Sequence, residues 1–333
     1  MAEISQAETH APIERVASRP IETSRSILIS MNPRAGSKSR HEHVDEIAIA
    51  LTGAGYNVYV TSNLDELNGR AEEGLQTGAM RAVVAVGGDG TASVVRNHVP
   101  LEVPLLIVPM GTENLLGRYV GQGTDPAAVC DVIENGVVVN LDLGRAGDKY
   151  FLLMVSAGFD AEVIRSLHEN RRGNINHLAY LRPTLRTIRR YDYPLMRIYW
   201  DSTLSPSVEP TTCRWVFGFN FPLYALGLPI APAAIATDGL LDVCSFERGA
   251  VWSVARYLWH IFRKMHLNLP DAQLCQARRF RLEAAEGGTV SYQVDGDFGG
   301  ILPVEVEVLP GKLRLLVSRA AAQRMGITVP DEV

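Results

Sequence analysis

The sequence predicts two folded parts, an α/β domain followed by a mostly antiparallel β domain of sandwich type. Short apolar runs alternate with helical patterns up to about residue 140, and strand patterns dominate after it. The chain has 333 residues, of which 47% are hydrophobic, which is enough for two cores. We expect residues 25–142 to form the α/β domain, residues 143–310 to form the β domain, and residues 311–325 to complete the first domain.

The first half has the pattern of a parallel sheet covered by helices. Its strands are continuous apolar runs, as in strands that are buried on both faces. Asp125 and Pro126 predict the start of a further helix, because both suit a helix N-terminus. The expected strands are 27–29, 57–61, 82–86 and 105–108, and the expected helices are 44–51, 65–78, 91–98 and 112–119.

The second half reads as strands with few helices. Val304, Val306 and Val308 alternate with Glu305 and Glu307, as in a strand with one buried face. The expected strands are 141–143, 150–155, 195–200, 213–221, 240–246, 279–283, 290–294 and 304–308. The expected helices are 159–169, 178–190 and 250–265.

Composition excludes several classes of protein. The net charge of -5 gives no general affinity for nucleic acid, and the four cysteines form no CxxC pair that would indicate zinc. Residues 1–24 are polar and lack the apolar segment of a signal peptide, so we expect a disordered tail and a cytoplasmic protein. Residues 215–237 carry no charge, but their prolines favour a strand and an apolar loop, lining the core or a lipid pocket, over a membrane span.

The sequence Gly87-Gly88-Asp89-Gly90-Thr91 follows an apolar strand and precedes a helix. Glycines let the backbone approach a phosphate, and a helix N-terminus offers free amide donors. A tight turn is the alternative interpretation. Residues 32–37 and 109–114 follow other strands and again place Gly, hydroxyl and amide groups before a helix. Three such loops at the same sheet edge indicate phosphate binding.

These loops, with Ala157-Gly158-Phe159-Asp160, Asp238-Gly239-Leu240-Leu241-Asp242 and Asp295-Gly296-Asp297, resemble the diacylglycerol kinase catalytic domain family. The resemblance covers residues 26–318 and extends to sphingosine and ceramide kinases. It implies an NAD kinase/diacylglycerol kinase-like fold and transfer of the γ-phosphate of ATP to a lipid hydroxyl.

The same resemblance implies roles for individual residues. Asp297 would be the base that deprotonates the lipid hydroxyl, with Asp295 beside it and Asp89 in the phosphate loop. A structural Mg²⁺ would take a carboxylate from Asp238 and carbonyl oxygens from Leu240 and Ile235. The residues expected to contact ATP are Asn32, Thr61, Gly87, Gly88, Asp89, Gly90, Thr91, Ser93, Gly111, Thr112 and Asn114.

Three positions depart from the family pattern. Residues 92–94 replace the usual small-Asn-Glu sequence, Glu113 replaces a glycine, and Asp297 replaces a longer Glu. These changes keep a nucleotide- or lipid-binding pseudokinase open as an alternative. A kinase of a soluble acceptor, similar to NAD kinases, is the other alternative. The residues do not identify the lipid or the oligomeric state, and a homodimer stays open.

Two basic and aromatic patches indicate contact with an anionic membrane surface. The first lies in residues 165–197 and combines eight arginines with three tyrosines. The second lies in residues 252–266 and combines tryptophans with Arg256, Arg263 and Lys264. Solvated helix faces are the alternative interpretation. We therefore expect a cytoplasmic protein that associates peripherally with membranes and has a lipid substrate.

Overall fold

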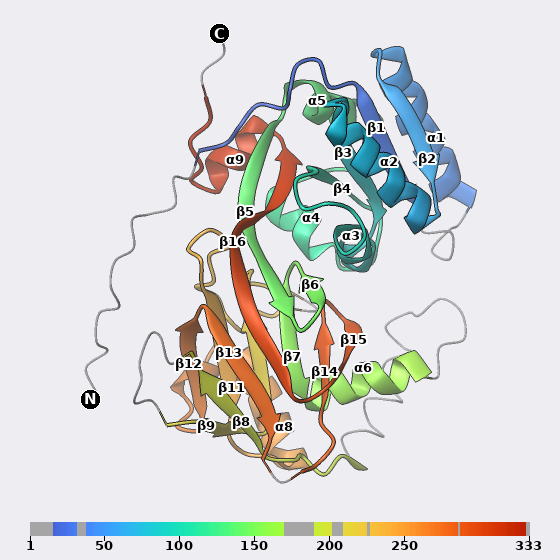
Figure 1. Ribbon diagram of the computed structural model, residues 1–333. Helices are drawn as coiled ribbons and strands as arrows, with labels where there is room; N and C mark the ends of the chain where they lie inside the picture. Colours follow the sequence, from blue (N-terminus) through green and yellow to red (C-terminus); the bar gives the residue numbers. More distant parts are fainter. Residues whose placement is uncertain are drawn as a thin grey trace.

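The structure is a computed structural model that describes residues 16–31, 38–169, 190–201, 209–224, 227–285 and 287–330. The expected phosphate loop at 32–37, the expected helix at 178–190 and most of the first arginine patch lie outside these residues. Figure 1 shows two parts, each built around a β-sheet, joined by two long strands that run from one part into the other.

The first part is a parallel sheet with the strand order β2-β1-β3-β4-β16. The strands β1, β3 and β4 are apolar because both faces of the sheet are covered there, and β3 is buried at every position. The strands are β1 (Ser26–Met31), β2 (Asn57–Thr61), β3 (Met80–Gly87) and β4 (Leu105–Pro109).

Helices cover both faces of this sheet. One core contains Ile27 and Ile29 of β1 together with apolar residues of α1 (Lys38–Gly53) and α5 (Pro126–Asn135). On the opposite face, Leu28 packs in a core with the other helices. Those helices are α2 (Leu64–Gln76), α3 (Asp89–Arg96), α4 (Leu115–Val120) and α9 (Arg319–Arg324).

Two strands belong to both parts of the molecule. β5 (Val137–Ala146) and β16 (Val304–Val317) pair antiparallel along most of their length, as Figure 1 shows. The last residues of β16 extend the parallel sheet beside β4. Its first residues pair with β13, so one ten-stranded sheet is continuous between the two parts.

The second part is a sandwich of two antiparallel layers. The extension of the first sheet contains β6 (Lys149–Phe151), β8 (Met196–Trp200), β9 (Thr211–Cys213) and β13 (Arg279–Ala284). The second sheet contains β12 (Ala272–Ala277), β11 (Leu241–Phe246), β10 (Trp215–Phe219), β7 (Met154–Gly158), β14 (Ser291–Val294) and β15 (Asp297–Ile301). Both layers contribute apolar side chains to one core, among them Val306, Phe280, Val216 and Val155. The other helices of the described residues are α6 (Phe159–Glu169), α8 (Val251–Phe262) and the 3₁₀ turn η3 (His266–Asn268).

The predicted fold class is confirmed, with two local corrections. The expected strand at 150–155 is broken into β6 and β7, because the amides of Leu152 and Leu153 bind a side chain instead of a neighbouring strand. Residues 16–24 do not belong to a disordered tail. Ser18 exchanges two backbone hydrogen bonds with Val138, and Ala17 donates to Thr328.

No helix within the described ranges is long and apolar enough to cross a membrane. The charge-free segment forms β10 and an apolar loop, as expected from its prolines.

Candidate functional site

The glycine-rich loops after β3 and β4 lie against each other. A Cβ atom on Gly111 would lie 2.3 Å from the Cα of Gly88, so the two backbones are in contact and neither loop has room for a side chain there. Asn114 fixes the second loop, because its Oδ1 accepts from the amide of Gly111 and its Nδ2 donates to the Gly111 carbonyl. The two loops therefore form one continuous backbone surface.

Asp89 connects the two loops. It is the first residue of α3, and its carboxylate oxygens accept hydrogen bonds from the amides of Leu115 and Leu116, each at 2.9 Å. Burial raises the pKa of the Asp89 carboxyl, the two amides oppose that change, and the charge of Glu113 adds to it. Asp89 thus caps α4 and positions the loops.

The third motif forms a tight turn between β14 and β15. Asp295 and Gly296 both have positive φ, at 50° and 88°, as a two-residue hairpin of type I′ requires. The Asp295 carboxylate accepts from the amides of Leu152, Leu153 and Met154, at 2.6, 2.8 and 3.1 Å. These bonds hold the hairpin on the break between β6 and β7.

A link to α3 completes the attachment of this hairpin. Burial raises the pKa of the Asp295 carboxyl to about 6, although the three amides and a hydrogen bond from Ser93 favour its charged form. Ser93 was expected to contact ATP, but its buried side chain serves this link between the two parts of the molecule.

Asp297 faces the first glycine loop. It is exposed, and its Oδ2 would lie 4.0 Å from a Cβ atom built on Gly90. The N-terminal turn of α3 and this carboxylate therefore face a common space. Among the three aspartates, Asp89 and Asp295 are held by backbone amides, whereas Asp297 is placed where a reacting group can approach.

A cavity of ≈ 620 Å³ begins at these loops and extends between the two parts. Asp89, Thr112, Glu113 and Asp295 line its polar mouth. Its interior is largely apolar and draws on four elements and two loops, through Leu153, Met154, Phe159, Val163, Ile164, Trp215, Leu228, Ile230, Leu258 and Ile261. A polar mouth that opens into an apolar interior suits a molecule with one reactive polar end and a long apolar part.

One polar cluster interrupts the apolar lining. Asp160 is buried and accepts from Trp215 Nε1 at 2.7 Å and from the hydroxyl of Ser156. Gln293 connects this cluster to the hairpin, because its Nε2 donates to Ser156 and Asp160 while its Oε1 accepts from the amide of Gly296. Burial raises the pKa of the Asp160 carboxyl.

Two protein-family models match the chain, one for each of the two parts of the structure. The diacylglycerol kinase catalytic domain matches residues 26–146, and the YegS C-terminal NAD kinase beta sandwich-like domain matches residues 153–317. The chain belongs to the diacylglycerol kinase catalytic domain family. Family membership identifies a kinase, whereas the acceptor is a separate question.

Individual relatives support the same family. A protein named diacylglycerol kinase from Mycobacterium tuberculosis strain H37Rv is 29% identical over 245 residues, which are 72% of this chain and 77% of that protein. A diacylglycerol kinase of Bacillus subtilis is 25% identical over 308 residues, 89% of this chain and 98% of that one. The solved structure of a Bacillus anthracis diacylglycerol kinase shares the fold, with a TM-score of 0.65 at 21% identity over 90% of this chain and 99% of that chain.

The predicted magnesium site in this kinase-family chain lies at the start of β11. Asp238 Oδ1 accepts from the amide of Leu240, and the Ile235 carbonyl accepts from the amides of Thr237 and Asp238. Asp242 adds a second carboxylate, which sequence reasoning did not assign. One of its oxygens is buried without a hydrogen-bond partner, and burial together with the charge of Asp238 raises its pKa to about 6.

Two carboxylates with an unsatisfied oxygen fit a hard divalent cation. Among the described residues no three acidic, His or Cys side chains gather to hold a metal, so backbone carbonyls would have to complete the coordination. Asp142 fixes this region, because its carboxylate accepts from the amides of Gly239 and Gly311. Asp142 was not assigned from the sequence. Its position as the one acidic residue in the buried, apolar strand β5 could have identified it.

Among the described residues expected to contact ATP, Asp89 and Thr112 line the cavity, whereas Thr61 does not. The Thr61 hydroxyl donates to Glu66 at 2.9 Å and accepts from the amide of Asn63, so it supports the start of α2. Asn32 lies outside the described residues. Gly87, Gly88, Gly90, Thr91, Gly111, Thr112 and Asn114 do lie in the two glycine loops.

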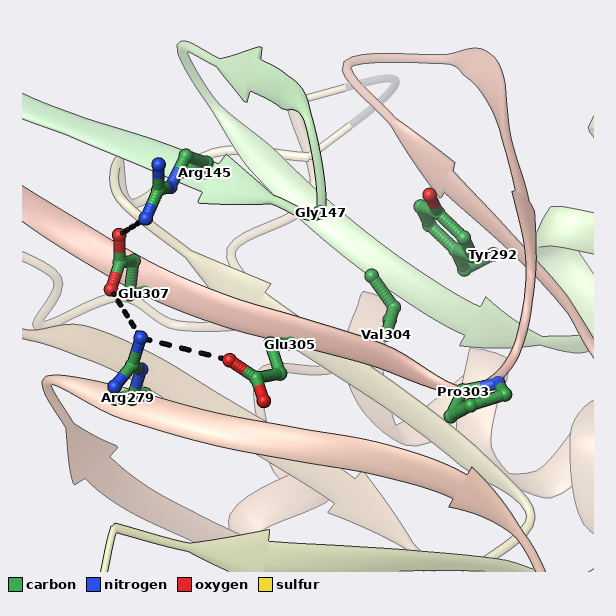
Figure 2. A pocket seen from close by; sticks show the side chains of 8 residues that line it. All are labelled: Arg145, Gly147, Arg279, Tyr292, Pro303, Val304, Glu305 and Glu307. Atoms are coloured by element: carbon green, nitrogen blue, oxygen red, sulfur yellow. Dashed lines mark ion pairs between the residues drawn. The ribbon is translucent and has the colours of Figure 1, made fainter.

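A second hollow of ≈ 330 Å³ lies along β5, β16 and β13, where the ten-stranded sheet extends into the sandwich (Figure 2). Glu307 pairs with Arg145 and with Arg279, which also reaches Glu305 at 3.6 Å. The two glutamates balance the charge of the two arginines, whose side chains are 42% and 50% exposed. The hollow is therefore lined by solvated ion pairs between neighbouring strands and does not indicate a binding site.

Proposed function

We propose that this protein is an ATP-dependent lipid kinase that transfers the γ-phosphate of ATP to the hydroxyl of a diacylglycerol- or sphingosine-like lipid. The apolar cavity that begins at the glycine loops is the main support, because a soluble acceptor such as NAD has no need of ten apolar side chains behind the reacting hydroxyl. Family membership supports the kinase activity.

The chain's own groups define the chemistry. In the proposed reaction the amides of the glycine loops and of the first turn of α3 hold the phosphates of ATP. The acceptor oxygen bonds to the γ-phosphorus while the bond to the β–γ bridging oxygen breaks, and ADP leaves with that oxygen. The hydroxyl proton passes to Asp297, which lies over Gly90. The lipid chains occupy the apolar interior and place the hydroxyl at the mouth.

Magnesium has two proposed places. With ATP it would neutralise phosphate charge during transfer. At the start of β11, Asp238 and Asp242 with the carbonyls of Ile235 and Leu240 would hold a structural ion at an inner strand of the six-stranded sheet. Because these residues do not line the cavity, such an ion would support the fold rather than contact the acceptor.

The test is phosphate transfer from γ-labelled ATP with Mg²⁺ to diacylglycerol, sphingosine and ceramide in mixed micelles and to NAD in solution. We expect transfer to a lipid, and a loss of about 10²- to 10⁴-fold in Asp297→Asn. Asp148→Asn is the matched control, because Asp148 is exposed in another turn of the same domain. Transfer to NAD alone would contradict the proposal.

One observation favours a second candidate, a nucleotide-binding pseudokinase. Glu113 lines the mouth of the cavity, where its charge opposes that of ATP phosphates. Binding of ATP without transfer to any acceptor, by both the natural chain and Glu113→Gly, would establish this second candidate.

A further inference from the structure

Helix α8 has an aromatic face that the fold does not use. Val254, Tyr257 and Ile261 are buried and attach the helix to the sandwich. On the opposite face, Trp252 and Trp259 are 84% and 59% exposed and lie two turns apart. Phe262, 70% exposed, continues this face at the end of the helix. Three large aromatic side chains on one exposed helix face are unusual unless another apolar phase covers them.

The same helix forms part of the wall of the cavity. Leu258 and Ile261 line the apolar interior, and Leu258 is 38% exposed. Leu258 and Phe262 are four residues apart, so Leu258 lies beside Phe262 on the flank of α8 between its aromatic and buried faces. The wall of the cavity therefore lies next to the aromatic face of α8.

The charges around this face are positive. Arg263 and Lys264 follow α8 directly, are exposed, and form no ion pair with a carboxylate of the described chain. The guanidinium of Arg263 lies 5.8 Å from the centre of the Trp259 ring. Tryptophan with adjacent arginine and lysine is the combination that suits the headgroup region of an anionic bilayer.

A buried anchor keeps α8 in place without using its outer face. Asp271 accepts from the hydroxyl of Tyr257 at 2.9 Å and pairs with Arg256, while Arg248 approaches it at 3.1 Å. The ring of Tyr257 packs on Phe246 at 4.6 Å. Substitutions on the aromatic face are therefore expected to leave the fold intact.

We propose that the aromatic face of α8 docks on an anionic lipid bilayer, and that the acceptor lipid passes from that bilayer into the cavity along the flank formed by Leu258 and Phe262. The second clause rests on the proposed lipid kinase function, whereas the first does not. Arg263 and Lys264 bind the headgroups, and the two tryptophans lie at the level of the interface.

The test compares the natural chain with the triple variant Trp252→Ser, Trp259→Ser, Phe262→Ser. Ile21→Ser, Ile49→Ser is the matched control, since both isoleucines are exposed apolar residues of the first part, at 61% and 72%. Sedimentation with phosphatidylcholine vesicles, with and without 30% phosphatidylglycerol, measures docking. We expect the triple variant to lose about tenfold or more in vesicle affinity and the control to bind as the natural chain does. Arg263→Gln and Lys264→Gln should each lose about fivefold, only on anionic vesicles.

Kinetics separate this inference from the proposed function. The triple variant should phosphorylate a vesicle-borne acceptor about tenfold more slowly, yet phosphorylate monomeric dioctanoylglycerol within about twofold of the natural rate. Undiminished vesicle binding by the triple variant would overturn the docking. A dimer of the natural chain in light scattering that the triple variant does not form would also overturn it, because the aromatic face of α8 would then be a dimer interface. Vesicle binding through α8 without transfer to any lipid would contradict the proposed function and the access route alone.

Discussion

At the mouth of the cavity, Asp89, Gly111 and Asp295 come from three short sequence motifs, whereas the interior collects side chains scattered from Leu153 to Ile261. The mouth is held by hydrogen bonds from backbone amides to carboxylates, with little tolerance for change. The interior is held by apolar contact, which tolerates substitutions of similar volume. Reactivity and acceptor choice are thus separate properties of one site.

Gly111→Ala tests the rigidity of the mouth and carries the largest expected effect. The new Cβ would meet the backbone of Gly88 at 2.3 Å, so the two loops must separate and Asp89 must lose its bonds to α4. We expect phosphate transfer to fall by about 100-fold or more, as for other losses of positioning. Gly69→Ala is the control, because nothing lies within 4 Å of its added carbon on the exposed face of α2. Equal activity of both variants would show that the loops need not touch.

Leu228→Trp tests the interior. Leu228 is half-buried and lines the cavity, so the larger ring should occupy space that we assign to an acyl chain. We expect kcat/KM to fall by about 10- to 100-fold for a long-chain acceptor and by less for a short-chain one, while the KM for ATP stays constant. The companion variant Leu228→Ala widens the same place. If both variants keep the natural preference for chain length, the acyl chain lies elsewhere.

Most of the fold and the mouth could be predicted from the sequence, because their signals are local. Apolar runs and glycine positions predicted β1 to β4 within two residues at either end, and Asp295-Gly296-Asp297 was predicted to contribute to catalysis. Ser93 and Thr61 were assigned to ATP, but their partners Asp295 and Glu66 depend on contacts that no local pattern encodes. The charge-free segment was expected to line the core or a lipid pocket, and its Trp215, Leu228 and Ile230 do line the cavity, but the rest of the interior could not be predicted for the same reason. Asp160, Trp215 and Leu258 become neighbours only when α6, β10 and α8 pack together.

Asp295→Asn tests how the hydrogen bonds at the mouth depend on pH. Burial raises the folded pKa of Asp295 from its ordinary 3.8 to about 6. A raised pKa means that the contribution of this group to stability is fully present below pH about 3.8 and is lost as the pH rises through about 6. The unfolding free energy of the natural chain relative to Asp295→Asn should therefore fall by on the order of 3 kcal/mol between pH 4 and pH 7. Denaturant unfolding measures it, and a pH-independent difference would show that the carboxyl is already charged at pH 4.

Glu113→Gly has the smallest expected effect. Removing this charge from the mouth should lower the KM for ATP about two- to fivefold, with kcat nearly constant, and the gain should shrink at high salt. Glu102→Gln is a suitable control, because Glu102 lies in the first part but does not line the cavity. A KM that is the same in both variants would place the phosphates away from Glu113.

The most direct test of the account measures kcat/KM for two acceptors that share a glycerol hydroxyl and differ in their chains, glycerol and monomeric dioctanoylglycerol. If the mouth supplies the chemistry and the interior holds the lipid, dioctanoylglycerol should be preferred by at least about 10³-fold, and most of that preference should disappear in Leu228→Trp. Equal kcat/KM for the two acceptors in the natural chain would contradict the assignment of the cavity to the lipid.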